Sequence, residues 1–397
     1  MSFGGPAGQI AILHREIVDR RRWLAEAEFT RALNFCMLLP GPEALQLAIF
    51  LGWKMHGVRG GIVAGLGFVL PAIALLFALS YVYVTHGSLP WVAGLLYGLQ
   101  AAVIALVLQA MVRISRRALK TPVLVVLAVG AFLAMEFLRV PFPLVLLVAA
   151  CIGAYTARND ADRAEPQTAP RPAPGAQSIK VALVGLVLWI LPLLAVALTL
   201  GGHSLWSRVY LFFTKAALVT FGGAYAVLGY VTTQLVDNLA WVSADQSVAG
   251  LALAETTPGP LVIVLQFMGF MAGWNQPGDL SPLGSALLAG ALASWATFLP
   301  SFMFILLGAP HVERLTRNAR VEAALGAITA AVVGVIATLA LLLAQVVLFP
   351  DGWRATPDWH AVLIALGAWW LLERTRMPLG AVLVAAAAVG LAVQFLR

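Results

Sequence analysis

Two long runs of apolar residues, 61–84 and 323–348, contain no charged side chain. A membrane-spanning helix needs about 20 mostly apolar residues, and both runs are long enough. A transmembrane β-barrel would instead show short alternating strands of about 10 residues. Only 11% of the 397 residues are charged and the mean hydropathy is +0.90, whereas an average soluble domain is about 25% charged. The sequence therefore predicts an all-α polytopic membrane protein and excludes a soluble enzyme or a disordered chain.

The residues that usually hold cofactors are few and scattered. Cys36 and Cys151 lie in separate apolar runs, and the six histidines show no metal-ligand spacing. There is no glycine-rich phosphate loop and no haem or flavin motif. The net charge of +7 comes from basic residues in short loops, a pattern typical of membrane topology. We expect no cofactor, no metal, no nucleic-acid partner and no enzymatic activity.

An internal repeat organises the chain. Three landmarks recur at one constant, ungapped spacing: Phe3-Gly4-Gly5 with Phe221-Gly222-Gly223, Trp23 with Trp241, and Pro40-Gly41-Pro42 with Pro258-Gly259-Pro260. Further along, Pro71 and Pro300 end similar segments at a slightly larger spacing. The chain therefore consists of two homologous halves, with a modest insertion in the second.

The repeat and the composition divide the chain into four parts. We expect residues 1–157 to form an N-terminal repeat and residues 158–180 a proline-rich cytoplasmic linker. We expect residues 181–204 to form a connecting transmembrane helix and residues 205–397 the C-terminal repeat. A long apolar-rich segment precedes Phe221, but only Met1 and Ser2 precede Phe3. Either the natural start lies upstream of Met1, which we expect, or the first repeat has lost half an element.

Lysine and arginine in short loops mark the cytoplasmic side of a membrane protein. The loop that holds Arg113, Arg116, Arg117 and Lys120 is therefore placed inside, as is the linker. Loop 235–246 has no lysine or arginine, unlike the basic loop around Arg21 to which it corresponds. The predicted crossings that separate the halves are 61–84, 93–112, 123–138, 141–157 and 181–200. Their odd number inverts the second half, and inverted repeats are typical of secondary transporters.

Each half contains an apolar segment broken by Pro-Gly-Pro. In the first half, residues 32–53 are predicted to form a re-entrant hairpin broken at residues 40–42. Freed backbone groups are tolerated in lipid only where they face protein or water, so both breaks are expected to line a polar cavity. The helices that begin near Glu43 and Leu261 would direct their N-termini at it, which suits an anion. Alternatively, the glycines of both motifs only permit tight helix packing.

Lys215 is the most prominent charged residue, because it lies inside an apolar segment. It is predicted to face the ligand, or alternatively to extend to the membrane interface. Glu255 precedes the second Pro-Gly-Pro closely, and is either a proton carrier, a partner of Lys215, or a structural hydrogen-bonding group. Glu43 is a second coupling candidate, although acids are favoured in a first helical turn anyway. Further hydrogen-bonding candidates in the cavity are Gln46, Thr256 and Thr257.

These motifs together resemble the chromate ion transporter (CHR) family in its long-chain, two-repeat form. The resemblance rests on residues 3–7, 21–24, 39–42, 46–48, 60–61 and 64–65, and on residues 220–223, 257–260 and 296–300 in the second half. It implies a secondary transporter in the bacterial inner membrane that exports chromate and confers chromate resistance. The substrate-binding residues expected from motifs and resemblance are Phe3, Gly4, Gly5, Pro6, Pro40, Gly41, Pro42, Gln46, Lys215, Phe221, Gly222, Gly223, Thr256, Thr257, Pro258, Gly259 and Pro260.

Several functions remain open at the level of the sequence. A dianion that leaves a negative interior gains about 4.6 kcal/mol at 100 mV, so export needs no ATP and can use the membrane potential, a proton gradient or both. Sulfate is also a tetrahedral dianion, and no residue separates the two by shape. The alternatives are an importer or exchanger of sulfate or another oxyanion, and an anion channel of the same architecture. Besides the transported anion and the lipid bilayer, the expected partner is a second copy in a homodimer.

Overall fold

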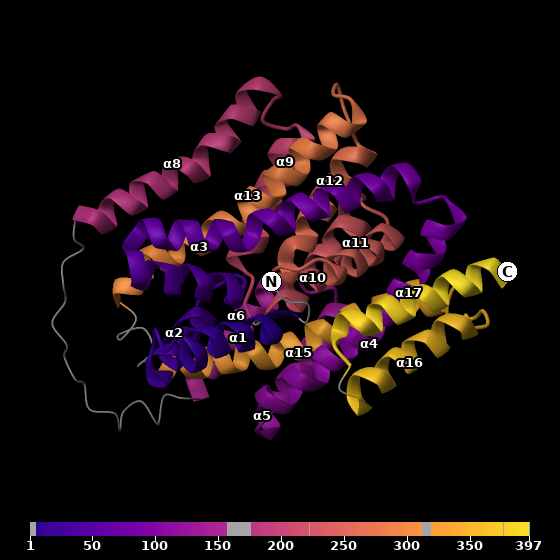
Figure 1. Ribbon diagram of the computed structural model, residues 1–397, viewed down its shortest axis with the longest axis horizontal. Helices are drawn as coiled ribbons and strands as arrows, with labels where there is room; N and C mark the ends of the chain where they lie inside the picture. Colours follow the sequence, from indigo (N-terminus) through magenta and orange to yellow (C-terminus); the bar gives the residue numbers. More distant parts are fainter. Residues whose placement is uncertain (1–4, 157–175, 222, 312–318, 376, 397) are drawn as a thin grey trace.

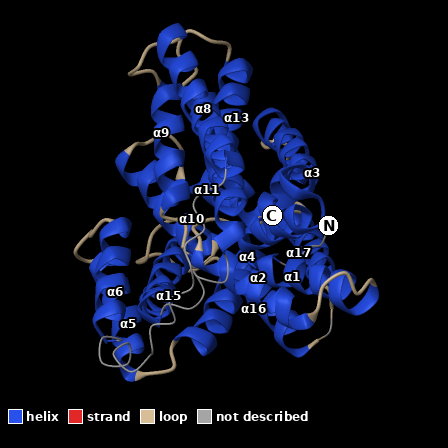
Figure 2. Cartoon of the chain, turned by 90° about the vertical axis from the view of Figure 1, so that its left-hand side faces the viewer, coloured by secondary structure: helices blue, strands red, loops and turns tan. Residues whose placement is uncertain are grey.

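The computed structural model describes residues 5–156, 176–221, 223–311, 319–375 and 377–396, and every regular element in these ranges is a helix (Figures 1 and 2). The first half contains α1 (Gly5–His14), η1 (Arg15–Arg20), α2 (Glu26–Leu38), α3 (Glu43–His86), α4 (Pro90–Ala118), α5 (Pro122–Glu136) and α6 (Phe142–Thr156). Then follow α8 (Ala176–Thr199), α9 (Leu205–Leu218), α10 (Ala224–Thr233), η2 (Gln234–Asn238), α11 (Ala244–Thr256), η3 (Leu261–Ile263) and α12 (Val264–Asn275). The chain continues with α13 (Pro282–Gly308), η4 (Ala309–His311), α15 (Ala319–Leu348), α16 (Trp359–Arg374) and α17 (Leu379–Leu396). The predicted all-α fold is confirmed.

Six of the described helices are long and apolar enough to cross a membrane: α3, α4, α8, α13, α15 and α17. The outward face of α8 exposes large apolar side chains, with Leu198 84% and Leu183 59% exposed. Such a surface is stable against lipid rather than water. A polytopic membrane protein is therefore confirmed. Helices α5 and α6 have 15 residues each, fewer than the roughly 20 that span a full hydrocarbon layer.

The two halves contain similar helices in the same order. Helices α2 and α11 both have 13 residues. The first residues of the two helices, and also their last residues, are separated by the same spacing as Trp23 and Trp241. The short π-helices η1 and η2 also follow α1 and α10 at nearly this spacing. The division into two halves and the inverted orientation of the halves in the membrane stay predictions.

Helix α3 contains a sharp reversal at His56 and Gly57, where the backbone leaves the helical conformation. Gly57 has a φ of 63°, which glycine adopts without a steric penalty. Gly52 and Gly60 then face each other so closely that a Cβ on either would overlap the other's carbonyl oxygen. Residues 43–55 therefore fold back along residues 58–86.

Two short helical hairpins follow from these breaks. The first consists of α2 and residues 43–55 of α3, and the second consists of α11 and the continuous helix Leu261–Asn275 formed by η3 and α12. Lys54 Nζ lies 3.0 Å from Glu28 Oε1, so the first hairpin begins and ends at one place. This geometry supports the predicted re-entrant path of the first hairpin.

The outer helices pack on this central part. Helix α8 lies against α13 and α9 at the top of Figure 1, whereas α17 runs along α4. Helix α8 begins at Ala176, so the last residues of the predicted linker 158–180 are helical, because this segment continues directly into the apolar run. Linker residues 158–175 lie outside the described residues.

Candidate functional site

The two Pro-Gly-Pro segments form the turns of the two hairpins; we call residues 40–42 the first tip and residues 258–260 the second tip. Gly41 has a φ of +131° and Gly259 a φ of +153°, both in the region that favours glycine. Pro42 and Pro260 are extended and directly precede the helices that leave the tips. Proline is tolerated at the start of a helix, and Pro-Gly-Pro with a glycine at positive φ forms a turn here, whereas the single prolines Pro71 and Pro300 lie inside α3 and α13.

Each tip packs against the proline-containing helix of the other half. A Cβ at Gly41 would lie 2.6 Å from Ser301 Oγ, which follows Pro300 in α13. A Cβ at Gly259 would lie 2.5 Å from the Cβ of Ala72, which follows Pro71 in α3. Each glycine and each residue that it contacts thus has its counterpart in the other half, at the spacings that define the repeat. The two contacts are therefore crossed and correspond to each other.

Hydrogen bonds hold the tips in place. The Gly41 backbone N–H donates to the Thr220 carbonyl oxygen at 2.8 Å, which joins the first tip to the second half. Gln46 Nε2 donates to the Pro40 carbonyl oxygen at 2.8 Å. In the second tip, Gln9 Nε2 of α1 donates to the Gly259 carbonyl oxygen. Carbonyl groups that the breaks release are thus satisfied by side-chain amides.

Between the tips lies a small cavity, which we call the tip cavity. It is lined by residues from α1, from both tips and from the starts of three helices: Gln9, Pro42, Glu43, Ala44, Gly223, Ala224, Pro260, Leu261 and Val262. Helices α3, α10 and Leu261–Asn275 all begin here. Three helix N-termini therefore converge on one cavity.

The helix starts at the tip cavity have no side-chain caps among the described residues. The residues that precede them are Pro42, Gly223 and Pro260, whose side chains cannot accept a hydrogen bond. Serine or aspartate side chains cap α9, α11, α13 and α16, whereas α2, α4 and α5 also begin without a side-chain cap. First-turn N–H groups and the positive ends of the helix dipoles therefore make the tip cavity suitable for an anion.

Two carboxyl groups lie in or near this region. Glu43 lines the tip cavity in the first turn of α3 and is half-buried. Glu255 is 5% exposed, and its Oε1 accepts a hydrogen bond of 2.6 Å from the Tyr225 hydroxyl. Tyr225 follows Ala224, which lines the cavity. Glu255 therefore makes a hydrogen bond, as in one of the three roles expected for it, and its partner is Tyr225.

The structure brings most, but not all, of the expected binding residues together. Pro42, Glu43, Gly223 and Pro260 line the tip cavity. Pro40, Gly41, Gln46, Pro258 and Gly259 build the two tips behind this lining. Gly5 begins α1, and Phe221 lies half-buried ahead of Gly223. Phe3, Gly4, Gly222 and the side chain of Pro6 lie outside the described part of the chain.

Three further expected residues do not line the tip cavity. Lys215 is exposed on α9 and does not line the tip cavity. The hydroxyl groups of Thr256 and Thr257 both donate to the Leu253 carbonyl oxygen of their own helix, at 2.7 and 2.8 Å. These bonds satisfy the end of α11 rather than a ligand.

Sequence reasoning missed Gln9, Ser301, Gln266 and Tyr225. Gln9, Ser301 and Gln266 are buried, and each has a side-chain oxygen without a hydrogen-bond partner among the described residues. A buried polar residue in a helix is a weak signal when it stands alone. The glutamines and Ser301 gain their significance from contacts with the opposite half.

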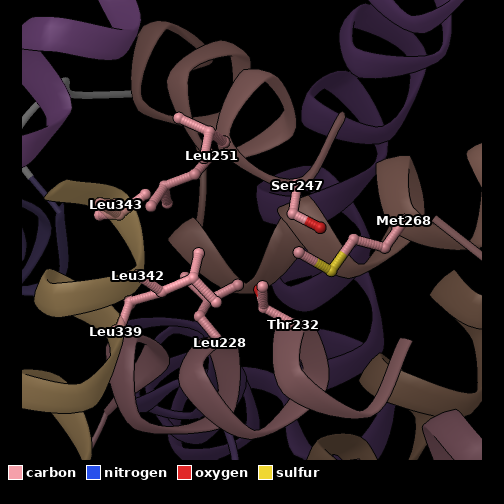
Figure 3. Close-up of a pocket in the computed structure, with 9 residues that line it drawn as sticks. Leu228, Thr232, Ser247, Leu251, Met268, Leu339, Leu342 and Leu343 are labelled. Atoms are coloured by element: carbon pink, nitrogen blue, oxygen red, sulfur yellow. The ribbon is translucent and has the colours of Figure 1, made fainter. Parts of the chain in front are cut away.

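A second pocket lies between α10, α11, α12 and α15 (Figure 3). Leucine side chains and Met268 surround it, and Figure 3 shows Ser247 and Thr232 as the polar side chains among them. No charged residue lines this pocket in the described part of the chain. Within the described residues there is also no group of three side chains that could hold a metal ion. The tip cavity is therefore the better candidate for an anion.

Comparison with known proteins places the chain among transporters. A family model described as chromate transporter matches residues 1–154 and 207–391. A chromate transport protein of Pseudomonas aeruginosa is 35% identical over 349 residues, which cover 87% of this chain and 78% of that protein. A probable chromate transport protein of Synechococcus elongatus is 29% identical, with 98% and 91% covered. A chromate transport protein of Cupriavidus metallidurans is 28% identical, with 92% and 83% covered. No solved structure matches.

Proposed function

Because the chain belongs to the chromate transporter family, we propose that it is a secondary transporter that exports chromate from the cytoplasm and confers chromate resistance. Its activity is transport and not catalysis. The observation that carries the proposal is the convergence of three uncapped helix N-termini on the tip cavity. Chromate is a tetrahedral oxyanion, and its oxygens accept hydrogen bonds from such N–H groups.

The transport step is a movement of the two halves around the tip cavity. Each tip contacts the opposite half, through Ser301 and Thr220 for the first and through Ala72 and Gln9 for the second. A relative rocking of the halves would therefore open the cavity to one side or the other. We place the protein in the bacterial inner membrane with residues 158–180 in the cytoplasm, and a homodimer remains an expectation.

The energy source is the membrane potential, a proton gradient, or both. Export of a dianion from a negative interior is favourable by about 4.6 kcal/mol at 100 mV. Proton coupling would use Glu43, which lines the cavity, or Glu255, which is linked to the cavity lining through Tyr225. Each carboxyl group lies close enough to respond electrostatically to an anion at the tips.

Chromate flux into everted membrane vesicles tests this proposal. Vesicles that contain the protein should accumulate chromate, and empty vesicles should not. Collapse of the potential alone should abolish uptake if the protein is a uniporter, whereas collapse of the proton gradient alone should abolish it if export is proton-coupled. Saturation and counterflow separate a transporter from an anion channel of the same architecture.

Competition with sulfate in the same vesicles tests the alternative substrate. Sulfate uptake into right-side-out vesicles, with no chromate transport in either orientation, would overturn the proposal in favour of a sulfate importer or exchanger. Equal inhibition by both anions would indicate a general oxyanion transporter.

A further inference from the structure

The side-chain amide of Gln9 donates one hydrogen bond, and its oxygen accepts none among the described residues. Its side chain is 4% exposed and lines the tip cavity. Its Nε2 donates to the Gly259 carbonyl oxygen, which fixes the orientation of the amide. Its Oε1 is buried and has no hydrogen-bond partner among the described residues. A buried carbonyl oxygen without a donor is unfavourable, and such groups are usually satisfied by a ligand or water.

The tip cavity thus presents two kinds of group to a ligand. The starts of α3, α10 and Leu261–Asn275 present N–H donors, which suit the oxygens of an anion. Gln9 Oε1 can only accept a hydrogen bond, and so can the Glu43 carboxyl group when it is ionised. An oxyanion with no hydrogen would be attracted by the first set and repelled by the second.

We propose that the tip cavity binds a singly protonated oxyanion, whose hydroxyl group donates a hydrogen bond to Gln9 Oε1. For a chromate transporter this form is the hydrogen chromate monoanion, which carries one negative charge, so the membrane potential favours its export half as strongly as that of the dianion. Gln9 is then a specificity-determining residue, because it selects for the protonation state of the ligand. This inference rests on the proposed function and names the species that the site takes.

The acceptor oxygen of Gln9 would distinguish chromate from sulfate, although the two anions have the same shape. Near neutral pH, a substantial fraction of chromate carries one proton, whereas sulfate carries almost none. A site that presents a fixed acceptor to a ligand hydroxyl rejects the analogue that lacks it, because the buried acceptor is then left unpaired. The cavity would therefore favour chromate over sulfate without any difference in size.

Other titratable groups surround the cavity and must be distinguished from the ligand. Glu43 lines it from α3, and Cys36 of α2 is close enough to Glu43 for an electrostatic interaction. Tyr225 of α10 contacts Glu255 of α11, and Arg113 of α4 also acts on Tyr225. If the pH dependence of transport comes from protonation of the ligand, it should persist when Glu43 is replaced by the uncharged glutamine.

The test is the pH dependence of chromate transport by the purified full-length protein in liposomes. Above the pKa of hydrogen chromate, the KM expressed as total chromate should rise about tenfold per pH unit while kcat stays constant, because the bound species becomes scarce. The Glu43→Gln variant should keep this slope. Sulfate should compete weakly at every pH.

The Gln9→Met variant tests the role of the amide, since methionine has a similar length and no acceptor oxygen. Its chromate KM at pH 6 should rise about tenfold, and its preference for chromate over sulfate should fall by a similar factor. The matched control is Gln109→Met, because Gln109 lies on α4 and contacts the Leu372 carbonyl oxygen away from the cavity. The control should keep the wild-type KM and selectivity.

The outcomes are distinguishable from failure of the proposed function. No chromate transport at any pH would overturn the proposed function itself. Transport by the wild type with a KM that does not change with pH would overturn the inference alone, whether or not the variants fold. A slope that disappears in Glu43→Gln, or a folded Gln9→Met variant with unchanged selectivity, would also overturn it.

Discussion

Lys54 Nζ lies 3.0 Å from Glu28 Oε1, and this ion pair joins the base of the first hairpin. At the base of the second hairpin, Asn275 Nδ2 donates to Gln246 Oε1 at 2.8 Å. Gln246 corresponds to Glu28 at the spacing that relates Trp241 to Trp23. The two hairpins are therefore closed in the same place by different chemistry, one pair being charged and the other neutral.

The ion pair between Lys54 and Glu28 is expected to make the free energy of unfolding depend on pH. The hydrogen bond and charge of Lys54 hold the pKa of Glu28 below its usual value. A lowered carboxyl pKa stabilises the fold at neutral pH, and this contribution is lost as the pH falls through the lowered folded-state pKa. Glu28→Gln should therefore cost at most about 0.5 kcal/mol at pH 7, since both groups are partly exposed, and less as the pH falls through that pKa.

Thermal unfolding in detergent at several pH values measures this effect. Gln246→Leu is the matched variant, because it breaks the neutral pair and should give a deficit that does not change with pH. A Glu28→Gln deficit of equal size at pH 3 and pH 7 would contradict the role of the ion pair.

The glycines of the two tips are expected to tolerate no Cβ. Gly41→Ala and Gly259→Ala would force a methyl group against Ser301 Oγ and the Ala72 Cβ, and each should destabilise the fold by about 1–3 kcal/mol. Chromate export should fall in parallel. Gly67→Ala is the control, because no atom lies within 4 Å of the Cβ it would add. Detergent melting and vesicle flux measure both effects, and wild-type behaviour of the tip variants would refute the crossed contacts.

Substitutions at Tyr225 and Glu255 test whether Glu255 is a structural group or a proton carrier. Tyr225→Phe removes the donor to a buried carboxyl group, which should destabilise the fold by about 1–3 kcal/mol. Glu255→Gln keeps an acceptor for the tyrosine and should fold. If Glu255 carries the coupled proton, this variant should still exchange chromate at equilibrium but should no longer respond to a proton gradient. A normal response to the gradient would leave Glu43 as the coupling candidate.

The inverted arrangement of the halves can be tested by labelling from one side. In a chain in which Cys36 and Cys151 are replaced by serine, Arg31→Cys and Arg59→Cys should react with an impermeant reagent from the cytoplasmic side. Asp245→Cys should react only from the opposite side. Labelling of positions 31 and 59 from opposite faces would overturn the re-entrant hairpin, and cytoplasmic labelling of position 245 would overturn the inversion.

The exposure of Lys215 favours the second of the two roles that the sequence left open for it. Because the side chain lies on the outer face of α9 and does not line the tip cavity, extension to the membrane interface is favoured. Lys215→Ala should change the KM for chromate less than about twofold, as for other exposed substitutions. A loss of transport with normal folding would restore a role in binding, by contact in another conformation.

The sequence was sufficient to predict the features that depend on local chemistry. Uninterrupted apolar runs indicated the helices, and Pro-Gly-Pro marked the two tips because proline and glycine in succession favour a turn, whereas the single prolines Pro71, Pro192 and Pro300 lie inside helices. The constant spacing of the repeated landmarks also related the tips before any contact was known. Glu43 was found because an acid next to a helix break in an apolar segment is conspicuous.

The remaining features depend on contacts between distant segments. Gln9 reaches Gly259 across 250 residues, and no pattern near residue 9 indicates this partner. Tyr225 is one aromatic residue among many in an apolar chain. Lys215 is the reverse case. A charged residue in an apolar segment is rare and therefore suggests a function, but the direction of its side chain is set by the packing of α9. Residue type was therefore easier to predict than orientation.

The crossed contacts of the tips also limit how this molecule can evolve. Gly41 lies against Ser301 and Gly259 lies against Ala72, so a larger residue at either glycine would require a smaller residue at the position that it contacts. Substitutions at these four positions are therefore expected to be correlated among related sequences, each tip changing together with the helix that it touches.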